Sequence, residues 1–330
     1  MNNIFKRIFR GKNPIKILIA LIILALLFAS AGDDLLKGAS ELSLEIIILL
    51  FLLQITTLIL VAYQWHYIFK TKIDVNITFN AIFRINLAAK FIESITPAAK
   101  LGGESARILL FSRLTGKDAG SMLAGVSLQK TSSMLGLTIF FLPFILFWPY
   151  NLDLEFLSGS NTLFPSLRSG LTLITVPALI IVLFLHGKLK DSLANKIKNL
   201  YKNTLSSLMD IFTVKTLFAL TFIALLFWGL YPIKVYVIAG ELGGEVSLIE
   251  AAAATFLAYM VSMVPLTPGG LGSFEAVMAL VLRETGMSWE GGVTAAILLR
   301  IFTFWLPLLA SVLSAMSLSL DVNYLGSSEQ

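Results

Sequence analysis

Long apolar runs, spaced along the whole chain, limit most strongly what this sequence can fold into. They cover residues 15–31, 44–69, 77–96, 118–148, 169–186, 213–239, 247–264 and 290–318 of a 330-residue chain. A helix needs about 20 apolar residues to cross the hydrocarbon core of a bilayer. Charged residues make up 14% of the chain, whereas soluble domains carry about 25%. The sequence therefore predicts one all-α polytopic membrane domain over residues 1–330.

The placement of Lys and Arg decides between eight crossings and six crossings with two re-entrant hairpins. Cytoplasmic loops carry an excess of these residues. With hairpins at 77–116 and 247–286, the cytoplasmic side collects residues 1–16, 70–117 and 186–215, which hold five, eight and six of them. Eight crossings would move the third group and the end of the second to the outside. We therefore expect six crossings, two hairpins and cytoplasmic N- and C-termini in the cell membrane.

The net charge of +5 also raises the question of nucleic-acid binding. The basic residues lie between apolar runs rather than in a solvated patch with aromatic residues, so membrane topology explains them and no nucleic-acid partner is expected. In residues 188–210, lysines alternate with apolar residues at helical spacing. This stretch predicts a cytoplasmic amphipathic connector, which a simple attraction to anionic lipid also explains.

The stretch VPLTPGGLGSFEA interrupts an apolar segment with prolines and glycines, and TPAAKLGGESA repeats its landmarks. Pro97 precedes Glu104 by seven residues, as Pro268 precedes Glu275, and each unit has a cation fourteen residues after its turn glycine. The repeat units cover about 44–148 and 213–318. The residues expected at the two breaks are Pro97, Gly102, Gly103, Pro265, Pro268, Gly269, Gly270 and Gly272.

The two hairpins are expected to enter from opposite sides, so the repeat is inverted. Inverted repeats with broken helices are typical of secondary transporters, in which the breaks line the substrate site. Unpaired backbone groups are tolerated at that depth only inside protein or beside a wet cavity. A chance similarity between two turns rich in glycine and proline is the alternative.

Two cations are expected about eleven residues into their helices, near the middle of the bilayer, namely Lys130 and Arg300. An unpaired cation there costs at least about 2.5 kcal/mol, so each should contact a partner or water. Glu104 and Glu275 are the natural partners. The pairs are either structural links between each hairpin and the next helix, or groups that receive an anionic headgroup or carry a coupling proton.

Other polar and aromatic residues in the apolar runs have simpler interpretations. Lys234 is expected to extend its side chain to the outer surface. Trp65, Trp148 and Trp289 fall at expected membrane interfaces and are interpreted as anchors.

The sequence contains little that indicates catalysis. The chain has no cysteine and two histidines, so no metal site is expected, and no phosphate-binding or hydrolase motif predicts a cofactor or an enzyme. The remaining enzymatic alternative is a membrane-embedded transferase that uses Glu104 or Glu275 as a base.

At PAAKLGGESAR and PLTPGGLGSFEA the chain resembles the lysylphosphatidylglycerol synthase transmembrane-region family, known from the lipid flippase half of the multiple peptide resistance factor. The likeness runs from about residue 15 to 318. The first motif is matched by Gly102, Gly103, Glu104 and Arg107, and the second by Pro268, Gly269, Gly270, Gly272, Glu275, Gly286 and Arg300. Members often have Glu-Arg and a later Asp where this chain has Gln129, Lys130 and Ser133.

The resemblance implies a flippase that moves a charged-headgroup phospholipid or a prenyl-linked lipid between leaflets. Its implied path residues are Glu104, Arg107, Lys130, Glu275 and Arg300, and its partners are membrane lipids. The alternative is a non-transporting subunit that scaffolds a lipid-synthesising enzyme or glycosyltransferase. The chain ends at Gln330 without a soluble transferase domain, so synthase activity is not expected. The pattern favours no particular oligomeric state.

Overall fold

The computed structural model describes residues 42–95, 99–147, 211–262, 270 and 272–327, and every regular element in these ranges is a helix. In chain order the elements are α3 (Leu44–Ile68), η1 (Phe69–Ile73), α4 (Phe79–Ile95), α5 (Ala99–Thr115), α6 (Ala119–Phe147), α9 (Val214–Glu241), α10 (Leu248–Ser262), α11 (Ser273–Glu284), α12 (Trp289–Arg300), η5 (Ile301–Trp305) and α13 (Leu306–Ser327). The expected segments 15–31 and 169–186, the connector 188–210 and the break residues Pro97, Pro265, Pro268 and Gly269 lie outside the described residues.

Within the described ranges, three helical stretches are long and apolar enough to cross a membrane, namely Leu44–Ile73, Val214–Glu241 and Trp289–Ala315. Their outward surfaces carry large apolar side chains, among them Phe51 on α3 and Phe218 and Phe222 on α9. Soluble proteins rarely expose so many large apolar side chains, and surfaces of this kind contact a membrane or another protein. The described helices therefore form a membrane protein.

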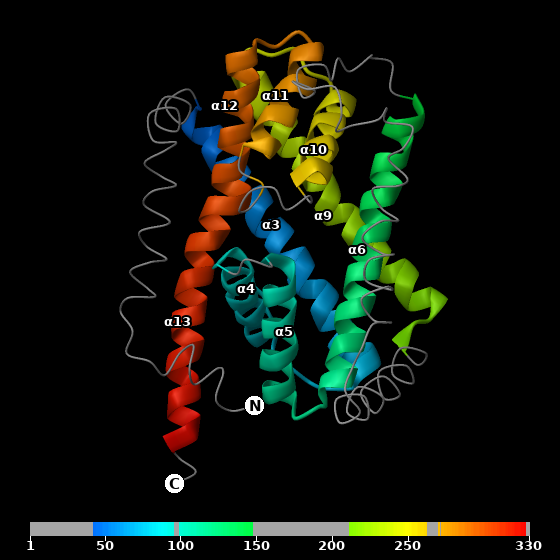
Figure 1. Ribbon diagram of the computed structural model, residues 1–330, viewed down its shortest axis with the longest axis vertical. Coiled ribbons are helices and arrows are strands. Elements are labelled where there is room, and N and C mark those ends of the chain that lie inside the picture. Colours follow the sequence, from blue (N-terminus) through cyan, green and yellow to red (C-terminus); the bar gives the residue numbers. More distant parts are fainter. Residues whose placement is uncertain (1–41, 96–98, 148–210, 263–269, 271, 328–330) are drawn as a thin grey trace, which may run out of the picture.

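The two expected hairpins correspond to the helix pairs α4–α5 and α10–α11, and these pairs occupy opposite halves of the molecule. The α4–α5 pair lies in the lower half of Figure 1 and the α10–α11 pair in the upper half, while α3 and α9 cross between them. The long rod of α12, η5 and α13 runs past both halves, because α12 packs on α11 and α13 packs on α4. Helix α6 lies along α9 and also contacts α5.

Gly102 and Gly103 lie inside α5, which corrects their expected place at the first break. The helix begins at Ala99, so both glycines lie within it rather than between α4 and α5. A Cβ added at Gly103 would lie 2.7 Å from the Cβ of Glu93 on α4. The residue thus serves close packing between the two arms, which small residues allow in membrane helices.

The second break behaves as the sequence predicts at the two glycines that the structure describes. Gly270 has φ +67° and Gly272 has φ +82°, a region that residues with a Cβ rarely occupy. A Cβ at Gly270 would also lie 2.6 Å from the Cβ of Ser262 at the end of α10. Glycine is therefore needed at Gly270 both for the turn and for the close approach.

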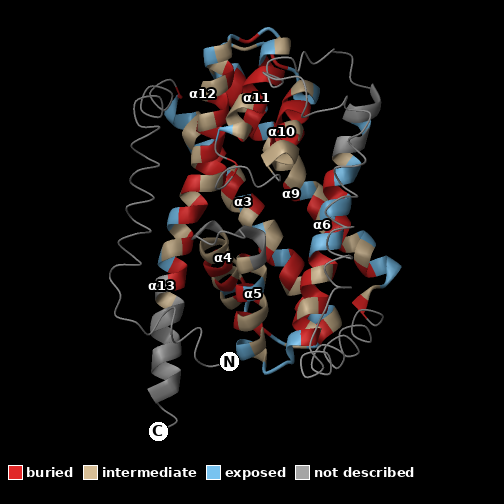
Figure 2. Ribbon diagram, in the orientation of Figure 1, coloured by how far each residue is buried: buried red, intermediate tan, exposed pale blue. Residues whose placement is uncertain are grey.

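Most buried side chains of the described residues gather in two large clusters, one in each half of the molecule (Figure 2), and a small third cluster joins α6 to α10. The upper cluster joins α9, α10, α11 and α12 around Phe274 and Met278. The lower cluster joins α3 to α6 around Trp65, Phe69 and Phe111, and the rings of Trp65 and Phe111 lie 5.1 Å apart. Trp65 is only 1% exposed, so its expected role as an interface anchor is wrong.

Candidate functional site: two buried ion-pair clusters

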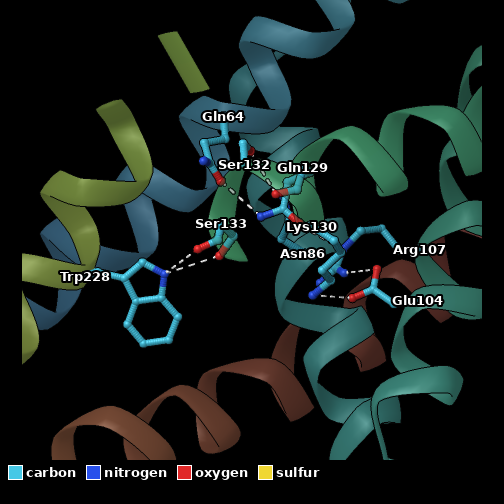
Figure 3. Close-up of polar contacts among 9 residues, drawn as sticks. All are labelled: Gln64, Asn86, Glu104, Arg107, Gln129, Lys130, Ser132, Ser133 and Trp228. Atoms are coloured by element: carbon cyan, nitrogen blue, oxygen red, sulfur yellow. Dashed lines mark hydrogen bonds and ion pairs between the residues drawn. The ribbon is translucent and has the colours of Figure 1, made fainter. Parts of the chain in front are cut away.

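The first cluster forms around Glu104, whose carboxylate contacts two cations. Its Oε2 atom lies 2.5 Å from Nη1 of Arg107, one turn later on α5, and its Oε1 atom lies 2.6 Å from Nζ of Lys130 on α6. Arg107 also donates from Nε to Oδ1 of Asn86 on α4, at 3.0 Å. Figure 3 shows these side chains converging from three helices. The expected contact between Glu104 and Lys130 is therefore present.

The two cations of this cluster differ in burial. The side chain of Arg107 is 8% exposed and that of Lys130 is 48% exposed, while that of Glu104 is 16% exposed. The guanidinium of Arg107 also lies 5.7 Å from the ring centre of Trp65, within range of a cation–π contact. Arg107 is thus the buried partner of Glu104, and Lys130 is the partner that is accessible from outside the protein.

The second cluster forms where α11 begins after the broken segment. The Oε1 atom of Glu275 lies 3.0 Å from Nε of Arg300, and its Oε2 atom accepts a 2.7 Å hydrogen bond from the backbone N–H of Gly272. Arg300 also donates from Nη2 to the backbone carbonyl of Gly270, at 3.3 Å. The pair therefore ties the break itself to α12.

Aromatic rings surround Arg300. Its guanidinium carbon lies 4.7 Å from the ring centre of Phe274 and 5.3 Å from that of Phe304. The arginine ends α12, and the next five residues form the π-helix η5. Short π-helical stretches of this kind occur frequently at functional sites.

The two clusters share one plan. Each carboxylate lies on the helix that follows an expected break, and each pairs with a cation on the next helix. Glu275 lies in the first turn of α11, where the partial positive charge of the helix N-terminus stabilises a carboxylate, whereas Glu104 lies beyond the first turn of α5.

Lys234 contradicts its expected position at the membrane surface. Its side chain is fully buried on α9, and Nζ donates to Oε1 of Gln54 at 2.7 Å and to Oγ1 of Thr57 at 3.0 Å. It also lies 4.5 Å from the ring centre of Tyr231. Gln54 and Thr57 are three residues apart on α3 and so share one face, but other polar residues lie on the same helix, and the sequence does not indicate which of them Lys234 contacts.

Neutral side chains link α3, α6 and α9 beside the first cluster (Figure 3). Gln129 donates to Gln64 at 3.0 Å, and Gln64 donates to the backbone carbonyl of Leu220 at 2.8 Å. The indole of Trp228 donates to Ser133. Gln129 and Ser133 stand where the resembling family often has acids, so here both positions serve contacts between helices.

The start of α6, which carries Lys130, is set by a cap outside the apolar segments. Asp118 accepts hydrogen bonds from the backbone N–H groups of Gly120 and Ser121 and from the Ser121 hydroxyl, the last at 2.7 Å. The hydroxyl of Ser121 is the main cause of a lowered pKa at Asp118. An ionised cap satisfies the first N–H groups of the helix and holds its register.

Comparison with known proteins gives one family and several relatives. The family described as "Lysylphosphatidylglycerol synthase TM region" matches residues 15–311. A UPF0104 membrane protein of Pyrococcus horikoshii is 21% identical over 87% of this chain and 91% of its own length. Another, of Methanothermobacter thermautotrophicus, is 34% identical over 32% of this chain and 29% of its own length. The phosphatidylglycerol lysyltransferase of Bacillus subtilis is 25% identical over 84% of this chain, a match that covers 30% of the enzyme.

Proposed function

Because this chain belongs to the lysylphosphatidylglycerol synthase TM region family, we propose that it is a lipid flippase rather than an enzyme. It moves a charged-headgroup phospholipid or prenyl-linked lipid between the two leaflets of the cell membrane. The observation that carries this proposal is the pair of ion clusters, Glu104 with Lys130 and Arg107, and Glu275 with Arg300. The first cluster links α5 to α4 and α6, and the second links Gly270 and Gly272 to α12.

The physical argument starts from the cost of bringing a charged headgroup into hydrocarbon. A lone charge at the centre of a bilayer costs at least about 2.5 to 3.5 kcal/mol, and partners lower that cost. A headgroup that carries a phosphate or an amine can replace either member of an ion pair, so the protein can exchange an internal contact for a substrate contact. Lys130, 48% exposed, is the partner best placed to begin this exchange.

The topology that belongs to this proposal has six crossings and two re-entrant hairpins, at 77–116 and 247–286, in inverted repeat units. Both termini and the connector 188–210 are cytoplasmic. The arrangement in Figure 1 supports it, because the α5–α6 turn and the α9–α10 turn lie at opposite ends of the molecule. The lipid path runs between the two hairpins, as in transporters built from broken helices.

Single cysteines test this topology directly, because the chain has no cysteine of its own. Lys117 and Glu245 are exposed residues in the α5–α6 and α9–α10 turns. In intact cells, Glu245→Cys is expected to react with a membrane-impermeant maleimide, whereas Lys117→Cys is expected to react only after permeabilisation. The same accessibility for both cysteines would contradict the inverted arrangement.

Translocation is tested by reconstituting the full chain into vesicles with labelled lipids in both leaflets. In protein-free vesicles, an impermeant quencher should extinguish only the label in the outer leaflet. In vesicles with protein, it should extinguish nearly all of the label, because lipids from the inner leaflet reach the outer one. Labelled phosphatidylglycerol, phosphatidylethanolamine and a polyprenyl phosphate are the three probes. If the protein accelerates the exchange of none of them, the flippase proposal is wrong.

A second candidate is a non-transporting subunit for a lipid-synthesising enzyme or glycosyltransferase. The match to 30% of the Bacillus subtilis lysyltransferase favours it, since that enzyme joins a similar membrane region to further sequence. This candidate predicts that an enzyme co-purifies with the chain. It also predicts that cells keep the enzyme's product when Glu275→Gln or Arg300→Met is introduced.

A further inference from the structure

Lys234 carries a buried charge that has no acidic partner in the described part of the chain. Its exposure is 0%, and its hydrogen-bond acceptors, Gln54 and Thr57, are neutral. The ring face of Tyr231 adds a cation–π contact at 4.5 Å. These neutral contacts satisfy the hydrogens of the ammonium but leave its charge uncompensated. A buried charge of this kind ordinarily has a counter-ion.

Gln54 supplies a second, independent sign of a missing anion. An ammonium can only donate, so Gln54 must turn its Oε1 atom toward Lys234, and the orientation of its amide is thereby settled. Its Nε2 atom is then buried without an acceptor among the described residues. A buried donor left unsatisfied costs about 1–3 kcal/mol. An anion beside Lys234 would accept from this amide.

A second cation lies near the first. The ammonium of Lys90, on α4, is close enough to Lys234 for the two charges to repel each other. Lys90 also approaches the backbone carbonyl of Thr303 in η5, at 3.5 Å. Lys90 therefore lies within electrostatic range of Lys234 and beside η5. Glu93, on the same helix as Lys90, offsets part of its charge.

We propose that Lys234, Gln54 and Lys90 form a binding site for an oxyanion, the phosphate of an anionic lipid headgroup. This inference rests on the proposed function, and it narrows the substrate from a charged lipid to one with a net negative headgroup. Phosphate suits the site because its several oxygens can accept from both ammonium groups and from the amide at once. The residues that accept hydrogen bonds from the Lys234 amine, Gln54 and Thr57, belong to neither glutamate cluster.

Binding is measured on the purified full chain in detergent, with dioctanoyl phosphatidylglycerol, dioctanoyl phosphatidylcholine and inorganic phosphate as probes in isothermal titration. The wild-type chain is expected to bind the phosphatidylglycerol most tightly. Lys234→Gln is expected to weaken that binding about tenfold or more, the size of one charge-assisted hydrogen bond. Lys215→Gln, the matched change at an exposed lysine on the same helix, is expected to leave it unchanged.

Gln54→Glu separates binding from folding. It places a carboxylate beside the Lys234 ammonium, so the variant is expected to melt at a higher temperature than the wild-type chain and yet to lose the phosphatidylglycerol. Unchanged binding in Lys234→Gln or Gln54→Glu would overturn the site. If the phosphatidylcholine binds equally well, or if inorganic phosphate is the only probe that binds, the bound oxyanion is not the phosphate of an anionic lipid.

The translocation assay distinguishes failure of this inference from failure of the proposed function. Lipid exchange by wild-type protein, together with unchanged binding in Lys234→Gln, would refute only the anion site. Lysine-dependent binding without lipid exchange would refute the flippase and retain the site. If Lys234→Gln removes only a pH dependence of transport, the lysine carries a proton and the anion site is wrong.

Discussion

Replacing Arg300 with methionine is expected to destabilise the protein by about 3–5 kcal/mol, the cost of leaving one partner of a buried ion pair uncompensated. The change strands the carboxylate of Glu275, which is 15% exposed, and removes the bond to the Gly270 carbonyl. It also removes the cation–π contacts with Phe274 and Phe304. The break before α11 then loses its tie to α12, so lipid exchange should stop as well.

Thermal unfolding in detergent and the vesicle assay measure the two effects. Arg283→Met, at an exposed arginine on α11, is the matched control and should change neither. Glu275→Gln combined with Arg300→Met removes both charges, so it should destabilise the protein less than the sum of the single changes. A double variant that is fully additive would show that the two side chains are not coupled. Exchange at the wild-type rate by a folded Arg300→Met variant would show that the pair of Glu275 and Arg300 has no part in the lipid path.

Replacing Glu104 with glutamine is expected to have the second-largest effect, because this one carboxylate neutralises two cations. The change leaves the buried Arg107 with the neutral Asn86 and the ring of Trp65, and removes the counter-ion of Lys130. We expect a loss of about 3 kcal/mol in stability, of which most belongs to the buried partner. Lys130→Met should cost less than about 1 kcal/mol, because an ion pair with a half-exposed side chain contributes little.

The order of the single variants is the decisive measurement. Melting temperatures should fall most for Glu104→Gln and Arg107→Met and least for Lys130→Met. Lipid exchange should respond differently, because Lys130 is the partner open to a headgroup, so its loss should slow transport in a protein that remains stable. If Lys130→Met has a low melting temperature and normal lipid exchange, Lys130 stabilises the fold and does not contact the headgroup, the opposite of both expectations.

The helices of this protein follow closely from the apolar pattern. The expected runs 44–69, 77–96 and 247–264 correspond to α3 over Leu44–Ile68, α4 over Phe79–Ile95 and α10 over Leu248–Ser262. This agreement has a simple cause, because a backbone surrounded by lipid must satisfy its own hydrogen bonds, and the helix is the structure that does so within one segment. The two ion pairs followed from the same reasoning, since a cation at depth requires a partner.

The errors concern the direction in which individual side chains face. Lys234 and Trp65 were expected at membrane surfaces, and both are buried against other helices. A lysine near a helix end can reach water or can turn inward, and only a polar partner on another helix, such as Gln54, decides between them. Gly102 and Gly103 show the same dependence, because both lie inside α5, where Gly103 allows α4 to approach.

The sequence by itself determined the class of protein, the positions of the described helices and the partners in the two ion pairs. These features follow from local composition and spacing, which the bilayer constrains strongly. Only the tertiary structure decided which faces of α3, α4 and α9 meet, and with them the buried Lys234, its neutral partners and the unsatisfied amide of Gln54. Such contacts join residues as much as 180 positions apart, and no local pattern specifies how two crossing helices are rotated about their axes.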